Sequence, residues 1–187
     1  MKTESNVMYI IRLAAILLII TSVVAAALAG VNGITSPIIA QKTAEKTQMA
    51  IEAVLPGGGE EMADLPAVAY DGADLVSRVY KGENGYAVEV TPGGFDNIIT
   101  MMVGVDTQGK VLGISIIKHT ETAGLGAVAA AGTPAGEAFR SQFVGTSGNV
   151  AVTKDGGAMD AITGATITSR AVCAGVNAAL ACVATLG

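Results

Sequence analysis

The pattern of apolar and polar positions changes character near residue 30. From Leu13 to Gly30 no residue is charged, and a shorter apolar run lies on the other side of Arg12. A helix that spans a bilayer needs about 20 predominantly apolar residues. We therefore predict a single transmembrane helix over residues 7–30, preceded by a cytoplasmic N-terminus of residues 1–6.

Basic residues on either side of this run indicate its orientation. Lys2 and Arg12 lie at its start, and Lys42 and Lys46 follow it at a distance. Basic residues close to the membrane favour the cytoplasmic side, so we predict a cell (inner) membrane protein whose folded part lies on the outer, periplasmic side. A cleaved signal peptide is the alternative, because residues 27–29 form an A-x-A site; the folded part is exported in either case.

Beyond the anchor, the pattern predicts a short helix and then a linker. Thr43 to Val54 has apolar residues at roughly helical spacing, and the sequence Leu-Pro-Gly-Gly-Gly at 55–59 ends it. We assign residues 31–59 to a connecting helix and linker, and residues 60–187 to one folded domain. The acidic stretch 60–74 is predicted to be a loop.

Short alternating segments in the middle of the chain predict two β-hairpins, and helical spacing returns near the end. The hairpins pair Leu75–Tyr80 with Tyr86–Thr91, and Ile98–Val105 with Lys110–Lys118. Pro134–Val144 is predicted to be a helix, because Phe139 and Phe143 are four residues apart. A last helix has one apolar face made of Val172, Val176, Ala179, Leu180 and Val183. Strands in the middle and helices at the ends predict an α+β domain with a mainly antiparallel sheet flanked by helices.

The net charge, the two cysteines and the single histidine argue against a nucleic-acid partner, a disulfide and a metal site. The 187 residues carry a formal net charge of −5, which argues against a nucleic-acid partner. Cys173 and Cys182 fall on opposite faces of the last helix, about 13.5 Å apart along its axis, so we predict packing residues and not a disulfide. His119 has no Cys or His partner at ligand spacing, so we predict a solvated or strand-end histidine and no metal site.

Hydroxyl side chains cluster where the last helix is expected to begin. Thr163, Thr166, Thr168 and Ser169 lie within residues 160–169. Thr168 or Ser169 is the predicted N-cap. The free amides and the positive end of the helix dipole also make this turn a suitable seat for a phosphate group, although a plain helix cap is the commoner reason for such a cluster.

Two motifs resemble those of one flavoprotein family. Residues 160–166, Asp-Ala-Ile-Thr-Gly-Ala-Thr, resemble the D-x-x-S/T-G-A-T/S signature of the exported FMN-binding-domain family. Residues 119–126 resemble the H-x-E-T-P-G-L-G loop of the same family, with Ala123 in place of Pro. In that family a flavin transferase takes FMN from FAD and joins its phosphate as an ester to the last Thr of the signature.

The resemblance implies a set of site residues. It implies covalent FMN on Thr166 and no catalytic residue. For Asp160 it implies recognition by the flavin transferase or metal-assisted attack in that enzyme, and a solvated loop acid is the alternative. Phosphate contacts are expected from Thr163, Gly164 and Ala165, and contacts at or near the flavin ring from Glu121, Thr122, Leu125 and Gly126.

The layout of the whole chain is similar to that of the G subunits of Rnf complexes, which are ion-translocating ferredoxin:NAD+ oxidoreductases. This likeness implies an electron-carrier subunit without turnover of its own, working with membrane and iron-sulfur subunits that move Na+ or H+. The C subunit of the Na+-translocating NADH:quinone reductase has the same layout in a longer chain. The sequence is also compatible with a stand-alone exported flavoprotein that reduces an external acceptor, and with a flavin-free, membrane-tethered interaction module.

Overall fold

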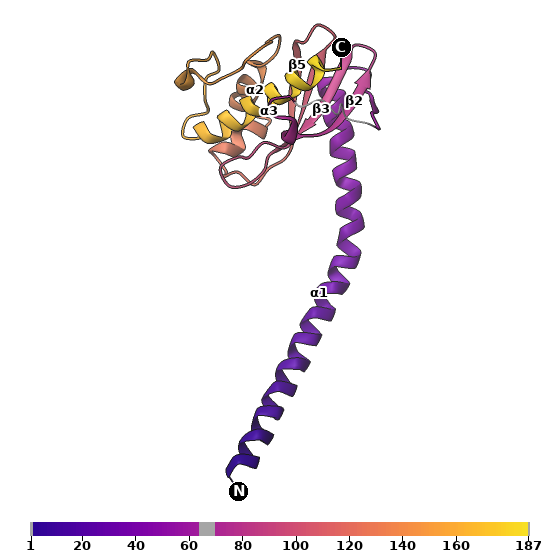
Figure 1. Ribbon diagram of the computed structural model, residues 1–187, viewed down its shortest axis with the longest axis vertical. Coiled ribbons are helices and arrows are strands. Elements are labelled where there is room, and N and C mark those ends of the chain that lie inside the picture. Colours follow the sequence, from indigo (N-terminus) through magenta and orange to yellow (C-terminus); the bar gives the residue numbers. More distant parts are fainter. Residues whose placement is uncertain (1, 64–69, 187) are drawn as a thin grey trace. The chain divides into compact units, whose positions relative to one another are not determined.

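The chain is represented by a computed structural model, which describes residues 2–63 and 70–186 (Figure 1). It divides into two compact units, Met1–Glu45 and Lys46–Gly187. In chain order, the elements are α1 (Lys2–Val54), β1 (Glu60–Glu61), η1 (Ala73–Leu75), β2 (Val76–Gly82), β3 (Gly85–Val90), β4 (Thr100–Asp106), β5 (Val111–Lys118), η2 (Gly126–Ala130), α2 (Pro134–Ser141), η3 (Thr153–Asp155) and α3 (Thr166–Ala184).

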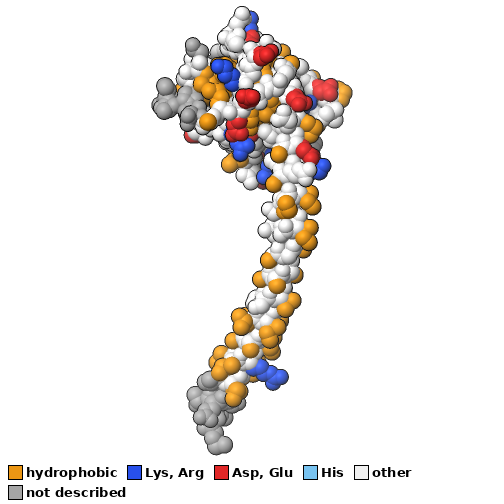
Figure 2. All heavy atoms as spheres, turned by 90° about the vertical axis from the view of Figure 1, so that its right-hand side faces the viewer, with side chains coloured by type: hydrophobic (Ala, Val, Ile, Leu, Met, Phe, Trp, Pro, Cys, Tyr) orange, Lys and Arg blue, Asp and Glu red, His pale blue; other side chains and the backbone are white. Residues whose placement is uncertain are grey.

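The N-terminal unit lies within the long helix α1. The stretch Met8–Val54 is long and apolar enough to cross a membrane, as judged by length and composition, and apolar side chains follow the helix along its length (Figure 2). Residues 31–54 continue this helix, with Pro37 inside it, where we predicted a separate connecting helix. The physical reason is that residues 38–46 are mostly strong helix formers such as Ala, Gln, Lys and Glu.

The sheet of the C-terminal unit is a five-stranded antiparallel meander with the strand order β1-β2-β3-β4-β5. Both predicted hairpins are confirmed, and the first has a tighter turn than expected because Gly82 pairs with Gly85. In the second turn, Asp106 Oδ1 accepts hydrogen bonds from the amides of Gln108 and Lys110, each at 2.8 Å. The predicted loop 60–74 contains β1 and the start of η1, while its residues 64–69 lie outside the described part.

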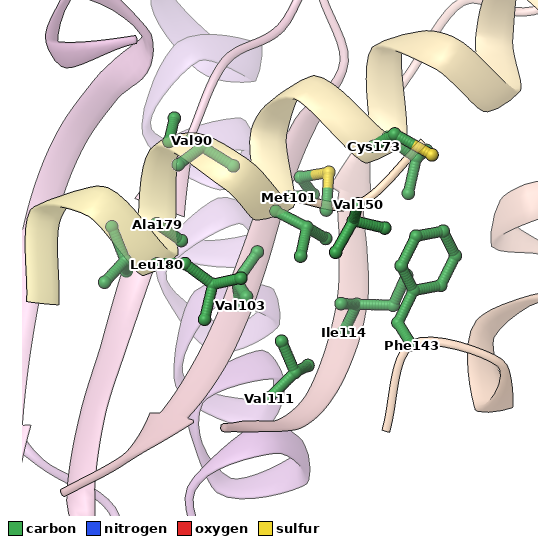
Figure 3. Packing of buried hydrophobic residues seen from close by; sticks show 14 of the residues in the cluster. Val90, Met101, Val103, Val111, Ile114, Phe143, Val150, Cys173, Ala179 and Leu180 are labelled. Carbon is green, nitrogen blue, oxygen red and sulfur yellow. The ribbon is translucent and has the colours of Figure 1, made fainter. Parts of the chain in front are cut away.

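One face of the sheet packs against α3 and carries the larger core. All five residues of the predicted apolar face of α3 are buried, and Figure 3 shows two of them, Ala179 and Leu180, above strand residues such as Val103. Phe139 and Phe143 are also buried, with ring centroids 5.4 Å apart in an edge-to-face arrangement. Cys173 and Cys182 are free and buried in this core, so both are packing residues. The predicted α+β class is thereby confirmed.

The opposite face of the sheet packs against the last turns of α1. Ile51, Val54 and Leu55 are buried there against Tyr80 and Met102. A Cβ built on Gly104 would collide with the main-chain carbonyl of Val54. Gly104 therefore lets the end of α1 approach the sheet directly.

Gly104→Ala is expected to destabilise the folded domain by roughly 1–3 kcal/mol, because overpacking forces the backbone of α1 away from the sheet. The measurement is thermal unfolding of the full chain in detergent. Gly113→Ala is a matched control: Gly113 pairs with Gly104 across β4 and β5, and its added Cβ would meet Val54 Cα at an ordinary 3.8 Å. Equal melting temperatures for the two variants would contradict this account of the packing.

Candidate functional site

The two motifs of the sequence analysis meet at one cavity of about 300 Å³. It lies between the loop after β5 and the first turn of α3, and its size is at the lower end of the range of small-molecule sites. The lining residues are Phe95, Glu121, Thr122, Leu125, Gly126, Lys154, Gly164, Ala165, Thr166, Ile167 and Thr168.

A tight turn in the signature brings the two motifs into contact. The Ala165 amide donates to the Ile162 carbonyl at 2.9 Å, and Gly164 between them has φ +76°. This left-handed conformation favours glycine. A Cβ on Gly164 would lie 3.0 Å from Leu125 Cδ2, so the two loops approach each other closely at this position.

The helix α3 begins at Thr166, inside the signature, and Ala165 precedes it. No side chain in the described part of the chain caps this end, so the prediction that Thr168 or Ser169 is the N-cap is wrong. The reason is that both residues already lie in the first turn, where their hydroxyls find other partners. Ser169 Oγ donates to the Ala165 carbonyl and accepts from the Ile162 amide, each at 3.0 Å.

The hydroxyl of Thr166 faces a cation. Lys154 Nζ lies 3.3 Å from Thr166 Oγ1, and both residues line the cavity. Next to Lys154, Asp155 forms two hydrogen bonds of 2.7 Å with Arg170. This bonding lowers the pKa of Asp155 and raises the pKa of Arg170. The amides of the first helical turn lack partners within the helix, so this corner of the cavity suits an anion.

Glu121 lines the cavity and is only 8% exposed. Its Oε1 accepts hydrogen bonds from the amides of Phe95 at 2.8 Å and Asp96 at 3.3 Å, and its Oε2 accepts one from Thr168 Oγ1. A Cβ on Gly126 would collide with the same carboxylate. Glu121 thus joins its own loop to the loop 94–97 and to α3. Both of its carboxylate oxygens already accept hydrogen bonds from the protein.

The structure separates the two ends of the signature. Asp160 and Thr163 line a second, open hollow of about 580 Å³, together with Gln142. The Gln142 side chain bonds to both main-chain groups of Asp160, at 2.7 Å to its amide and 3.3 Å to its carbonyl. The rest of the predicted cofactor contacts line the first cavity. The roles of all of these residues toward a ligand stay predictions.

Three apolar side chains at the cavity remain accessible to solvent. Phe95 is 68% exposed, Ile167 49% and Leu125 42%. Apolar walls beside an anion-binding corner suit a ligand with an aromatic ring and a phosphate. Phe95, Lys154 and Ile167 were missed by the sequence analysis; only the position of Ile167, directly after the signature, could have indicated it.

Comparison with known proteins supports the importance of this region. The model of the FMN-binding domain family matches residues 94–181, a range that contains the whole cavity. The chain is 31% identical to the G subunit of the Na(+)-translocating ferredoxin:NAD(+) oxidoreductase complex of Acetobacterium woodii, over 94% of this chain and 92% of that protein.

Two further relatives have similar names and extents. The G subunit of the ion-translocating oxidoreductase complex of Methanosarcina acetivorans is 31% identical, over 88% of this chain and 89% of the relative. The G subunit of the proton-translocating ferredoxin:NAD(+) oxidoreductase complex of Clostridium ljungdahlii is 34% identical, over 82% of this chain and 80% of the relative. The match to the Acetobacterium woodii protein, over 94% of this chain, therefore extends into the apolar N-terminal region as well as the domain.

Proposed function

This chain belongs to the family of G subunits of ion-translocating oxidoreductase complexes, and from that premise we propose that it carries electrons through FMN bound covalently to Thr166. The complex is a ferredoxin:NAD+ oxidoreductase that moves Na+ or H+, as the names of the relatives indicate. The observation that carries the attachment is the position of the Thr166 hydroxyl, at the start of α3, inside the cavity and beside Lys154.

The residues present fit FMN. The first turn of α3 offers amides and a positive dipole end to the phosphate, and Gly164 leaves the main chain accessible there. Phe95, Leu125 and Ile167 offer apolar surface to the ring. When bound, FMN supplies the electron-transfer chemistry, and the protein supplies its position and surroundings.

A covalent ester suits the proposed location on the outer face of the membrane. An ester keeps the flavin at the site without a free pool, because the tether fixes its effective concentration. We assign residues 7–30 of α1 to a single membrane anchor with the N-terminus in the cytoplasm, as the basic residues near its start favour. A flavin transferase is the partner in maturation, and membrane and iron-sulfur subunits are the partners in electron transfer.

The ion path is assigned to those partner subunits. Residues 13–41 of α1 contain no charged side chain, and the ionisable residues that mark ion and proton pathways in membranes are expected in those subunits. The role that we propose for this chain is electron transfer.

Membranes from cells that lack this chain are expected to lose ferredoxin-dependent NAD+ reduction, and expression of the wild-type chain should restore it. The purified chain alone should show no ferredoxin:NAD+ turnover, because the reaction also needs its proposed partner subunits. Full activity in the deficient membranes, or turnover by the isolated chain, would contradict the proposed function.

A further inference from the structure

We propose that Lys154 binds the phosphate group joined to Thr166, and that it promotes both the attachment of the flavin and the stability of the attached form. This inference rests on the proposed function. Lys154 lies outside both sequence motifs. Its ammonium supplies the positive charge that faces the negative phosphate of the ester.

The primary observation is a direct contact. Lys154 Nζ and Thr166 Oγ1 are 3.3 Å apart, although the two residues are 12 positions apart in the sequence. An ester on Oγ1 places its phosphorus one bond from that oxygen, so the phosphate oxygens fall within reach of the flexible ammonium. Charge-assisted hydrogen bonds of this kind are stronger than neutral ones.

The fold holds the segment that carries Lys154. Its two ends, Val152 and Met159, are buried in the core and form an isolated bridge. The Thr153 amide donates to the Met159 carbonyl at 2.9 Å. A Cβ on Gly157 would collide with the Ala151 carbonyl, so the segment is tightly closed. Lys154 is therefore presented at the cavity by a short, anchored loop that ends immediately before the signature.

The surrounding charges leave Lys154 available. The neighbouring carboxylate of Asp155 is paired with Arg170 at 2.7 Å. Glu121, the acidic residue in the cavity wall, already accepts from two amides and from Thr168. Among the side chains that the structure describes, no acidic group forms an ion pair with Lys154. An incoming phosphate thus meets a cation that no carboxylate contacts directly in this part of the structure.

The Lys154 ammonium acts during the transfer of FMN from FAD to Thr166. FAD is the co-reactant: a bond forms between Thr166 Oγ1 and the phosphorus of the FMN moiety, and the bond from that phosphorus to the bridging oxygen of the pyrophosphate breaks. AMP leaves with that oxygen, and the hydroxyl proton passes to a base of the transferase. The Lys154 ammonium stabilises the negative charge on the phosphoryl oxygens throughout, as fixed cations do in phosphoryl transfer.

The test compares flavin attachment to full-length chains in detergent, with purified flavin transferase and FAD, followed by intact mass. Lys154→Met should be modified about threefold to tenfold more slowly than the wild type, as expected for loss of one charged, solvent-accessible contact. Lys154→Arg should retain most of the rate. Lys110→Met, which removes an exposed lysine from the β4–β5 turn, should match the wild type. The difference in attachment rate between the wild type and Lys154→Met should become smaller at high salt.

A second measurement separates phosphate binding from a structural role. Flavin attachment should raise the melting temperature less in Lys154→Met than in Lys110→Met, while the flavin-free forms of both should melt like the wild type. If Lys154→Met does not fold, Lys154→Gln replaces it. Equal rates and equal flavin-dependent shifts in the two variants would overturn the role of Lys154. Failure of the wild type to acquire flavin would instead contradict the proposed function.

Discussion

Thr166→Ala should abolish covalent flavin in this protein. The chain made together with the transferase should show no flavin fluorescence after denaturing electrophoresis, and its intact mass should equal that of the polypeptide. The reason is that Thr166 Oγ1 combines three properties that favour the ester: it lies in the cavity, at the start of α3 and beside Lys154. Thr168 shares the cavity, but its hydroxyl is committed to Glu121.

The control for this variant is Thr107→Ala, which removes an exposed hydroxyl from the turn between β4 and β5. It should keep the full fluorescence and the full mass increment. Thr166→Ala should melt at nearly the same temperature as the flavin-free wild type, because Thr166 is partly exposed. Undiminished fluorescence in Thr166→Ala would contradict the assignment of the attachment residue.

Glu121→Ala should have the largest effect on stability. The buried carboxylate accepts from the amides of Phe95 and Asp96 and from the hydroxyl of Thr168. Its removal leaves three donors without their acceptor, and each unsatisfied buried donor costs about 1–3 kcal/mol, so the free energy of unfolding should fall by about 3–5 kcal/mol. Thermal unfolding in detergent measures the loss, and faster hydrogen exchange at the Phe95 amide locates it.

The matched control is Glu83→Ala, which removes an exposed carboxylate from the β2–β3 turn and should leave stability almost unchanged. Glu121→Gln should give an intermediate value, since its amide oxygen can still accept from the Phe95 amide. If Glu121→Ala were as stable as Glu83→Ala, Glu121 would not join the loop 94–97 to α3.

The hairpins and the apolar face of α3 could be predicted from the sequence because both depend on local patterns. Turn-forming residues fix a hairpin, and side-chain periodicity selects the buried face of a helix. The start of α3 was misplaced for the same reason. Thr168 and Ser169 look like caps in isolation, but the contact of Thr168 with Glu121 joins residues 47 positions apart, which no local pattern reveals.

The grouping of the site residues also depends on tertiary structure. Asp160 and Thr163 are close to Thr166 in sequence, yet the left-handed turn at Gly164 reverses the chain between them, and they line a different hollow. Conversely, Lys154 and Phe95 reach the Thr166 cavity from separate loops. Motifs identified the segments that form the site, and only the fold identified the side chains that meet there.

The most direct measurement is the mass and fragmentation of one tryptic peptide. Cleavage after Lys154 and after Arg170 releases residues 155–170, which contain all four hydroxyls of the cluster. We expect the mass of this peptide to exceed that of the unmodified peptide by the mass of FMN less one water. The fragments that contain Thr166 should carry this increment, and those that lack Thr166 should not. An unmodified peptide from flavin-loaded protein, or FMN located on Thr163, Thr168 or Ser169, would contradict the account.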